Sequence, residues 1–282
     1  MAKLSLAIVL MVGIVSVHTN KINVLEGLFD QVWEEANFDG LTLVYTWAPT
    51  FCVKGPCTLR STAKKIWTIH GLWPYSNNMA PSQGRTINCG GMYNQAAIST
   101  IRSELEDKWP SYSSKTTDQF WKHEYVKHGT CAGNLAKFNS QLKYFEGSID
   151  LFDRYDIKSI LANGNNPVLP SRNIYYPLSW ITTALKKGLG VEPNLYCISK
   201  NRVQYLFEIR VCFDTSPQSV LIDCTGLTGG GKCNPGTVVY PPFQDYVNAK
   251  SLSRDELDSD WLFNMVAEIM EDRDGDDETM QL

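Results

Sequence analysis

The chain has 282 residues, of which 43% are hydrophobic and 11% aromatic, and this composition excludes a disordered or fibrous protein. The formal net charge is −4, but residues 251–282 contain eleven acidic residues against Arg254 and Arg273, a local net charge of −9. Residues 20–250 carry a net charge of +4, which is compatible with a phosphate-bearing partner without requiring one.

The N-terminus has the pattern of a secretory signal. An uncharged apolar run, residues 4–17, follows Lys3 and ends at a polar segment. The run is too short to span a bilayer, and no other segment is long or apolar enough to do so. We therefore expect a signal peptide at 1–19 and no membrane association after its removal. The mature protein is expected outside the cell or in a lysosome-like or vacuole-like compartment.

The first half of the mature chain mixes helix and strand patterns. Apolar residues recur at helical spacing over 25–33 and then alternate over 41–47, as on the buried face of a strand. Residues 76–91 are rich in Asn, Gly, Ser and Pro and predict a long surface loop. A helix is expected over 93–108, with Pro110 stopping it.

The second half continues the mixture. A helix is predicted over 179–187 with Gly188 as its stop, and strand chemistry marks 204–213. Helices and strands do not alternate strictly, which favours an α+β domain over a doubly wound sheet. Apolar side chains in 251–282 share one helical face, which either docks on the body or binds a protein partner: Leu257, Trp261, Leu262, Met265, Val266, Ile269 and Met270.

The cysteines indicate disulfides. Their number is even, and the chain carries a secretory signal, so four disulfides are expected, with about 105 pairings open. A zinc site is the alternative, but there is no C-x-x-C pair and the spacings are irregular. The eight positions are Cys52, Cys57, Cys89, Cys131, Cys197, Cys212, Cys224 and Cys233.

Histidine is confined to two short segments of the mature chain. Residues 67–74 contain His70, and residues 120–131 contain His123 and His128. A random scatter would seldom concentrate three histidines in this way. Imidazole is the side chain that transfers protons most readily near neutral pH, so the two segments are candidates for a catalytic site.

The second histidine segment is predicted to be helical. The helix is expected to begin near Thr117 or Asp118, either of which can cap its N-terminus, and to run to Gly129. At about 100° per residue, positions four apart share a face. In such a helix, charged side chains four residues apart would lie next to one another.

Two pairs in this helix are four residues apart. Glu124 and His128 form one pair, and His123 and Lys127 form the other on an adjoining face. A carboxylate beside His128 favours the charged imidazole and fixes its orientation. Lys127 can neutralise developing negative charge without titrating. The spacing therefore predicts that Glu124 tunes His128 for proton transfer.

A zinc enzyme is the competing reading of this segment. His123 and Glu124 resemble the start of the zinc-protease signature, but His128 is five residues after His123. That spacing places the imidazoles about 140° apart instead of about 40°. We therefore expect no metal and no cofactor. A secreted RNA-binding or signalling protein, with the C-terminal helix as its interaction element, is the other alternative.

The two histidine segments carry a resemblance to a known family. Ile69-His-Gly-Leu-Trp-Pro74 and Phe120-Trp-Lys-His-Glu-Tyr-Val-Lys-His-Gly-Thr-Cys131 resemble the two active-site segments of the ribonuclease T2 family. The resemblance extends from about Leu41 to about Phe243. It implies a secreted endoribonuclease that cleaves single-stranded RNA without a metal, through a 2′,3′-cyclic phosphate, with low base specificity.

The resemblance also implies roles for individual residues. His128 is expected to act as general base on the ribose 2′-hydroxyl, and His70 as general acid to the departing 5′-oxygen. Glu124 and Lys127 would stabilise the pentavalent phosphorane, and His123 would help to hold the phosphate. The catalytic set is thus His70, Glu124 and His128.

Base contacts and departures from the family pattern follow from the same resemblance. One base is expected to stack on Trp73 and the other on Phe120. Tyr125 stands where the family usually has tryptophan. Tyr75 stands where many members have Asp or Asn reaching a base edge, which leaves the base preference open.

For the fold, the resemblance implies an α+β domain with an antiparallel β-sheet and packed helices, stabilised by disulfides. A ribonuclease domain at 20–250 would then be followed by the acidic amphipathic tail, 251–282. The implied pairs are Cys52–Cys57, Cys89–Cys131, Cys197–Cys233 and Cys212–Cys224.

Overall fold

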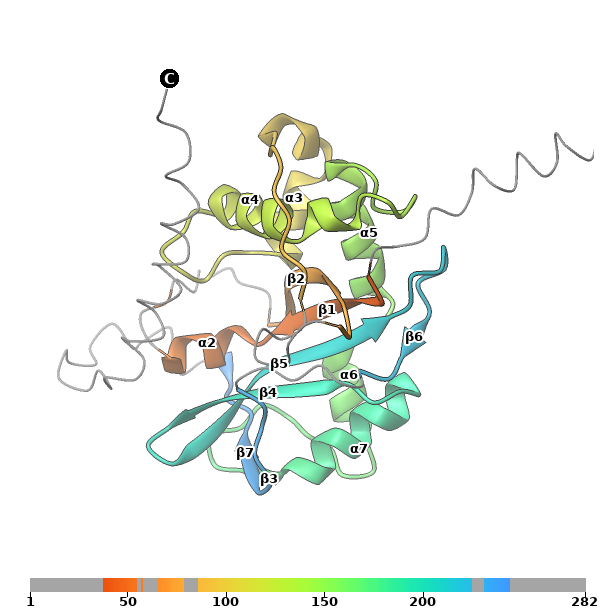
Figure 1. Ribbon diagram of the computed structural model, residues 1–282. Coiled ribbons are helices and arrows are strands. Elements are labelled where there is room, and N and C mark those ends of the chain that lie inside the picture. The colour runs from red at the N-terminus through yellow and green to blue at the C-terminus, as the bar shows by residue number, and fades with distance from the viewer. Residues whose placement is uncertain (1–37, 55–56, 58–64, 79–85, 225–230, 244–282) are drawn as a thin grey trace, which may run out of the picture. The chain divides into compact units, whose positions relative to one another are not determined.

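The computed structural model describes residues 38–54, 57, 65–78, 86–224 and 231–243 (Figure 1). Within these ranges seven strands form one sheet, and the main path through it runs β2-β1-β5-β7-β3, with β4 and β6 also pairing β5. The strands are β1 (Gly40–Thr46), β2 (Thr68–Tyr75), β3 (Tyr175–Pro177), β4 (Asn194–Lys200), β5 (Val203–Phe213), β6 (Leu221–Ile222) and β7 (Thr237–Val239).

The sheet is antiparallel except at one pair. β5 and β7 run parallel, whereas every other pairing is antiparallel. The expected α+β class with packed helices is confirmed, and the strand predicted over 204–213 is β5. The helical elements are α2 (Ala48–Lys54), η2 (Gln95–Ile101), α3 (Arg102–Lys108), α4 (Thr117–Lys127), η3 (Gly129–Ala132), α5 (Gln141–Asp153), α6 (Ile157–Ala162) and α7 (Leu178–Leu189).

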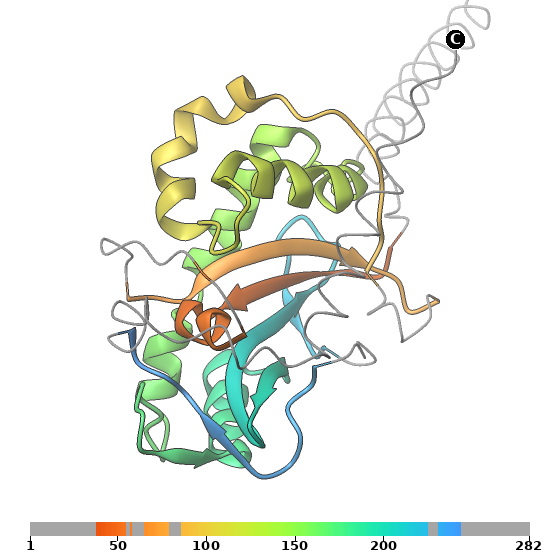
Figure 2. The ribbon, with the colours of Figure 1, turned by 90° about the vertical axis from the view of Figure 1, so that its left-hand side faces the viewer.

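Helices lie on two sides of the strands. Figure 2 shows α3, α4 and α5 gathered beside β1 and β2, with α6 and α7 at the other end of the sheet. Every residue of β1 is buried, so the strand has no solvent face. Tyr45 stacks on Phe152 of α5, while Thr42 lies beside Cys212. The alternation over 41–47 therefore predicted the strand correctly but missed that both its faces are covered.

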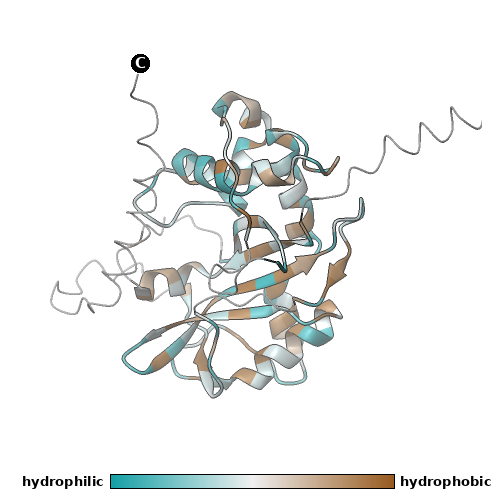
Figure 3. Cartoon of the chain, viewed as in Figure 1, coloured by the Kyte–Doolittle hydropathy of each residue, from teal (hydrophilic) through white to brown (hydrophobic). Residues whose placement is uncertain are grey.

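Polar residues nevertheless occur inside these strands. The central strands are largely brown in Figure 3, with teal segments between the apolar ones. Two such residues on β5 are Glu208, which is 3% exposed, and Arg210. A buried charge is costly unless it is paired, so its presence in a core strand indicates a specific partner.

The helix expected over 93–108 is two elements. Its first half is the 3₁₀ helix η2, whose N-cap Asn94 accepts a hydrogen bond from the Ala96 amide, and only Arg102–Lys108 is α-helical. Residues 98–101 are Ile, Ser, Thr and Ile. Serine and β-branched residues have low α-helical propensity, which accounts for the tighter, shorter form.

Two details of the predicted helix ends were wrong. Helix α4 begins at Thr117, as predicted, but its cap is Thr116, in a reciprocal capping box with Gln119, and the side chain of Asp118 instead binds Arg102. The capping box satisfies two otherwise unpaired amides, which fixes this starting point.

The second wrong detail is the C-terminal end of α7. The helix continues through Gly188 and ends at Leu189, because Gly190 has a φ of 77° and adopts the left-handed conformation of a helix C-terminus. Gly188 instead packs closely on Ile160 of α6, where a larger side chain would collide.

All eight cysteines are paired as the resemblance implies, in Cys52–Cys57, Cys89–Cys131, Cys197–Cys233 and Cys212–Cys224. The Cys89–Cys131 bond ties the end of the predicted 76–91 loop to η3, directly after α4. The Cys89 amide also donates to the Lys127 carbonyl at 2.8 Å. The disulfide and this hydrogen bond together hold residues 87–89 against the end of α4.

Replacing both Cys89 and Cys131 with alanine should lower the free energy of unfolding by about 4 kcal/mol, because the disulfide closes a loop of 42 residues. The Cys52–Cys57 disulfide joins residues only 5 positions apart, so replacing both of its cysteines with alanine should lower the free energy of unfolding by about 2 kcal/mol. Denaturant unfolding under oxidising conditions measures both. Equal losses would show that loop closure does not set the contribution of these bonds.

Several predictions lie outside the described residues. These are the signal peptide, the helix over 25–33, the domain boundaries at 20 and 250, and the amphipathic tail with its protein partner. The middle of the 76–91 loop also lies outside them. Within the described residues, no helix is long and apolar enough to cross a membrane.

Candidate active site

His70 stands at an irregularity in β2. Val44 of β1 pairs with Gly71 and Tyr45 pairs with Ile69, so His70 is an extra residue opposite β1. A β-bulge of this kind redirects a side chain and is common beside active sites. The His70 side chain remains 30% exposed although its neighbours in the strand are buried. The bulge thus brings one imidazole to the surface of a buried sheet.

Two carboxylates flank the His70 ring. Its Nδ1 donates to Glu208 Oε1 at 2.7 Å, and its Nε2 lies 3.7 Å from Glu124 Oε1. The two carboxylates come from different elements, Glu208 from β5 and Glu124 from α4. Both side chains are buried, at 3% and 2% exposure. His70 therefore sits between two anions that are removed from water.

Glu124 does not lie where the helical spacing predicted. Its Oε2 accepts a hydrogen bond from Trp73 Nε1 at 2.8 Å, and its ion pair is with His70, not with His128. The reason is that α4 ends at Lys127. His128 is its C-cap, with a φ of −124°, so the 100° rotation per residue no longer holds there. The prediction that Glu124 tunes His128 is wrong.

His128 is instead oriented by the backbone. Its Nδ1 donates to the carbonyl of Ile87 at 3.0 Å, and the residue is 5% exposed. A carbonyl only accepts, so this bond places the imidazole proton on Nδ1 and leaves the lone pair on Nε2. The neutral ring is then ready to accept a proton at Nε2.

A single indole brings the two imidazoles together. The His70 and His128 ring centroids lie 5.1 and 5.3 Å from that of Trp73. The two segments that carry them are 58 residues apart in sequence, from 70 to 128. The convergence of the two histidine segments, predicted from sequence, is thus present in the fold.

The environments of the two histidines shift their pKa values in opposite directions. Burial is the largest influence on His128 and lowers its pKa to about 3; the bond to Ile87 opposes this, and the charges of Lys127, His123 and His70 add to it. Burial also disfavours charge on His70, but the hydrogen bond and charge of Glu208, with the charge of Glu124, raise its pKa above 6.5. At mildly acidic pH, His70 is charged and His128 is neutral.

The pKa values of the two carboxylates, Glu124 and Glu208, are also shifted in opposite directions. Burial raises the pKa of Glu124 above its usual value, against the attraction of His70, the Trp73 bond and the charge of Lys127. Burial opposes ionisation of Glu208 as well, but Arg210 and His70 outweigh it and lower the pKa of Glu208 to about 2. Glu208 is therefore the permanent anion of the pair.

The other predicted residues surround this centre. Phe120 lies 5.7 Å from His70 between ring centroids and is partly exposed. His123 and Lys127 are partly exposed, and their charges reach His128. Trp73 is only 9% exposed, because His70, His128 and Arg210 cover it.

Sequence reasoning missed Glu208 and Arg210. Both lie on one face of β5, two residues apart, and Arg210 Nη2 donates to Glu208 Oε2 at 2.9 Å. The available signal was a charged pair at i, i+2 inside a strand of otherwise apolar character. Tyr75, noted as a departure, is buried against Cys212 and Cys224.

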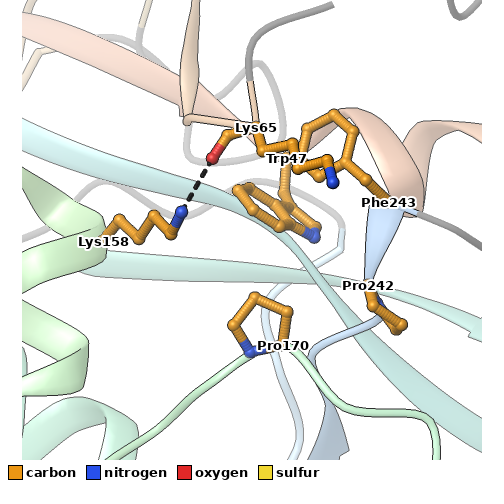
Figure 4. Close-up of a pocket in the computed structure, with 6 residues that line it drawn as sticks. All are labelled: Trp47, Lys65, Lys158, Pro170, Pro242 and Phe243. Atoms are coloured by element: carbon orange, nitrogen blue, oxygen red, sulfur yellow. Dashed lines mark hydrogen bonds between the residues drawn. The ribbon is translucent and has the colours of Figure 1, made fainter. Parts of the chain in front are cut away.

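Within the described residues, no group of three His, Cys, Asp or Glu side chains is arranged to hold a metal ion. A hollow beside Trp47, shown in Figure 4, shares no residue with the histidine site. It is lined by Trp47, Lys65, Lys158, Pro170, Pro242 and Phe243, and Lys158 Nζ donates to the Lys65 carbonyl at 3.0 Å.

Gly71 allows the Trp73–Glu124 hydrogen bond to form. A Cβ at position 71 would collide with both Glu124 Oε2 and Trp73 Nε1, the two atoms that this bond joins. We expect Gly71→Ala to lower kcat/KM on the RNA substrate that the sequence resemblance implies by about 10²-fold, a loss that displacing catalytic groups by about 1 Å can cause. The matched control is Gly90→Ala, where a Cβ meets nothing within 4 Å. Equal activities of the two variants would show that the bond is dispensable.

Comparisons with known proteins agree with this geometry. The model of the Ribonuclease T2 family matches residues 38–224. The chain is 30% identical over 223 residues to Ribonuclease T2 of Danio rerio, covering 72% of this chain and 88% of that protein. It is 32% identical over 216 residues to Extracellular ribonuclease LE of Solanum lycopersicum, covering 73% and 88%.

A solved structure shares the fold. RNase NT in complex with 5′-AMP superposes with a TM-score of 0.63 at 25% identity, covering 73% of this chain and 100% of that one. Fold, paired imidazoles and matches together define an endoribonuclease. The chain belongs to the ribonuclease T2 family.

Proposed function

We propose that this chain cleaves single-stranded RNA by attack of a ribose 2′-hydroxyl on the adjacent phosphorus, with release of a 2′,3′-cyclic phosphate and low base specificity. One observation carries the proposal: two imidazoles packed on Trp73 have pKa values shifted in opposite directions. An in-line transfer needs one proton removed and one delivered, and groups with separated pKa values supply one of each.

The proton path follows from the hydrogen bonds. Nε2 of neutral His128 removes the 2′-hydroxyl proton, since Nδ1 is engaged by Ile87. Charged His70 delivers its Nε2 proton to the departing 5′-oxygen, since Nδ1 is engaged by Glu208. The P–O5′ bond breaks as the P–O2′ bond forms. Water then opens the cyclic phosphate with the roles of the two histidines reversed.

Charge and aromatic surface supply the remaining functions. Glu124 and Lys127 stabilise the phosphorane, Glu124 through its contact with His70 and Lys127 through its charge, and His123 helps to hold the phosphate. Phe120, partly exposed beside His70, stacks one base. Trp73, which is 9% exposed, stacks the second base.

The same proposal includes a location. The predicted signal peptide and four disulfides suit an oxidising compartment, outside the cell or lysosome-like. The relative from Solanum lycopersicum is named an extracellular ribonuclease.

The 5′-AMP bound to RNase NT supports a nucleotide-bearing substrate for this fold.

A chimeric oligonucleotide tests the reaction class. We expect purified protein in excess EDTA to cut a single-stranded RNA and to leave cyclic phosphate ends, identified by mass. A matched strand with one 2′-deoxyribose should resist cleavage after that residue only. Cleavage at the deoxy position, or a requirement for added zinc, would refute the mechanism.

A further inference from the structure

We propose that Glu208, held in place by Arg210, is a positioning residue that fixes the His70 imidazole with its proton donor directed at the leaving group. This inference rests on the proposed function, because it assigns Glu208 to the general acid of that reaction. Glu208 itself need not touch RNA: it acts through the far nitrogen of the His70 ring.

The contact between Glu208 and His70 is short and removed from water. Glu208 Oε1 accepts from His70 Nδ1 at 2.7 Å, and the carboxylate is 3% exposed. A charge-assisted hydrogen bond of this length is among the stronger side-chain interactions. A proton held on Nδ1 leaves Nε2 as the nitrogen that exchanges its proton with substrate. One carboxylate thereby sets which nitrogen does the chemistry.

Arg210 keeps the carboxylate in place. Its Nε and Nη2 donate to Glu208 Oε2 at 3.2 and 2.9 Å. The guanidinium is itself confined, with Cζ 3.6 Å from the Tyr196 ring centroid and 5.0 Å from that of Trp73. Each oxygen of Glu208 therefore has its own donor, so the carboxylate cannot rotate without losing one of them.

The backbone on both sides of the contact is adapted to it. His70 is the extra residue of the bulge in β2. In β5, Cys197 of β4 pairs with Leu206 and Tyr196 pairs with Glu208, so Phe207 is the extra residue of a second bulge. Bulges change the direction of neighbouring side chains. Two of them, in strands on either side of β1, flank the contact.

Glu208 and Glu124 serve different nitrogens. Glu124 faces Nε2 at 3.7 Å, the side from which substrate approaches, whereas Glu208 binds Nδ1 directly. The charged groups that act on His70 are Glu208 and Arg210 from β5 and Glu124 from α4, and the charge of His70 in turn acts on His128. Arg210 disfavours charge on His70, so the carboxylates alone account for its raised pKa.

Glu208→Gln is the decisive variant. Glutamine has one acceptor oxygen, so it keeps the Nδ1 bond only with its NH2 group turned toward Arg210. It also carries no charge, so the pKa of His70 should fall by at least about one unit. Because His70 must be protonated to donate, the alkaline limb of kcat/KM should move to lower pH by the same amount. Activity at pH 5 should stay within a few fold of wild type. An unmoved alkaline limb would overturn the proposal.

Glu192→Gln is the matched control. Glu192 is an exposed carboxylate paired with Lys186, and its removal should leave the profile unchanged. The double variant Glu208→Gln, Arg210→Met covers the case in which the single variant does not fold, because it leaves no unpaired, partly buried cation. Its alkaline limb should also move to lower pH, by less than in the single variant.

A measurement on the unmodified chain needs no variant. Nitrogen-15 shifts of the imidazole should show that neutral His70 is the Nδ1–H tautomer, and an Nε2–H tautomer would overturn the proposal. This readout uses protein without RNA. Failure of RNA cleavage with the expected tautomer would therefore refute the proposed reaction, whereas cleavage with the Nε2–H tautomer would refute only the role of Glu208.

Discussion

Replacing either His128 or His70 with alanine is expected to lower kcat/KM on RNA by about 10²- to 10⁴-fold, the range for loss of a general base or acid. Each imidazole has its Nδ1 occupied, by Ile87 in His128 and by Glu208 in His70, so Nε2 is the nitrogen that each substitution removes from proton transfer. Initial rates on a defined oligonucleotide measure the loss.

A second substrate separates the two roles. When the 5′-oxygen is replaced by a p-nitrophenolate, the leaving group departs without a proton. The His70→Ala variant should then recover most of its activity, whereas the His128→Ala variant should not. Lys187→Ala, at an exposed position on α7, is the control for handling and folding. Equal rescue of both histidine variants would contradict the assignment of acid and base.

The pH dependence of kcat/KM should be broad and displaced toward acid. The proposed base, His128, must be neutral, so activity should be lost only as the pH falls toward its pKa of about 3. The proposed acid, His70, must be protonated, so activity should be lost as the pH rises through a pKa above 6.5. We expect a plateau between these limits and a decline of about tenfold per unit beyond each.

The acid limb must be separated from unfolding. The pKa of Glu208 is lowered on folding, so its contribution to stability is present above 4.5 and is lost as the pH falls through about 2. Circular dichroism at each pH distinguishes the two losses. An acid limb near pH 6 in folded protein would contradict a strongly lowered His128 pKa.

Local sequence patterns predicted those parts of the site that lie within one continuous stretch of sequence. The two histidine segments, the α4 helix and the class of the fold all follow from motif and periodicity. The role of Glu124 was misassigned because the pattern extended α4 past its true end at Lys127. Helix ends depend on caps, and a one-residue error there turns a side chain to another face.

Partners from distant strands were beyond such reasoning. Glu208 meets His70 across 138 residues of sequence, through β1, which pairs with both strands. The pKa directions were equally inaccessible, because burial dominates the shift of His128 and burial is a property of the folded chain. Only the unusual Glu208–Arg210 pair within β5 hinted at this partner.

A proton-by-proton titration of the resting enzyme is the most direct test. The NMR signals of the carbon-bound imidazole protons, assigned with the two alanine variants and followed from pH 3 to 9, give the pKa of each ring separately. The account predicts that His70 titrates above 6.5 and that His128 titrates several units lower. Rings that titrate together, or in the reverse order, would contradict it.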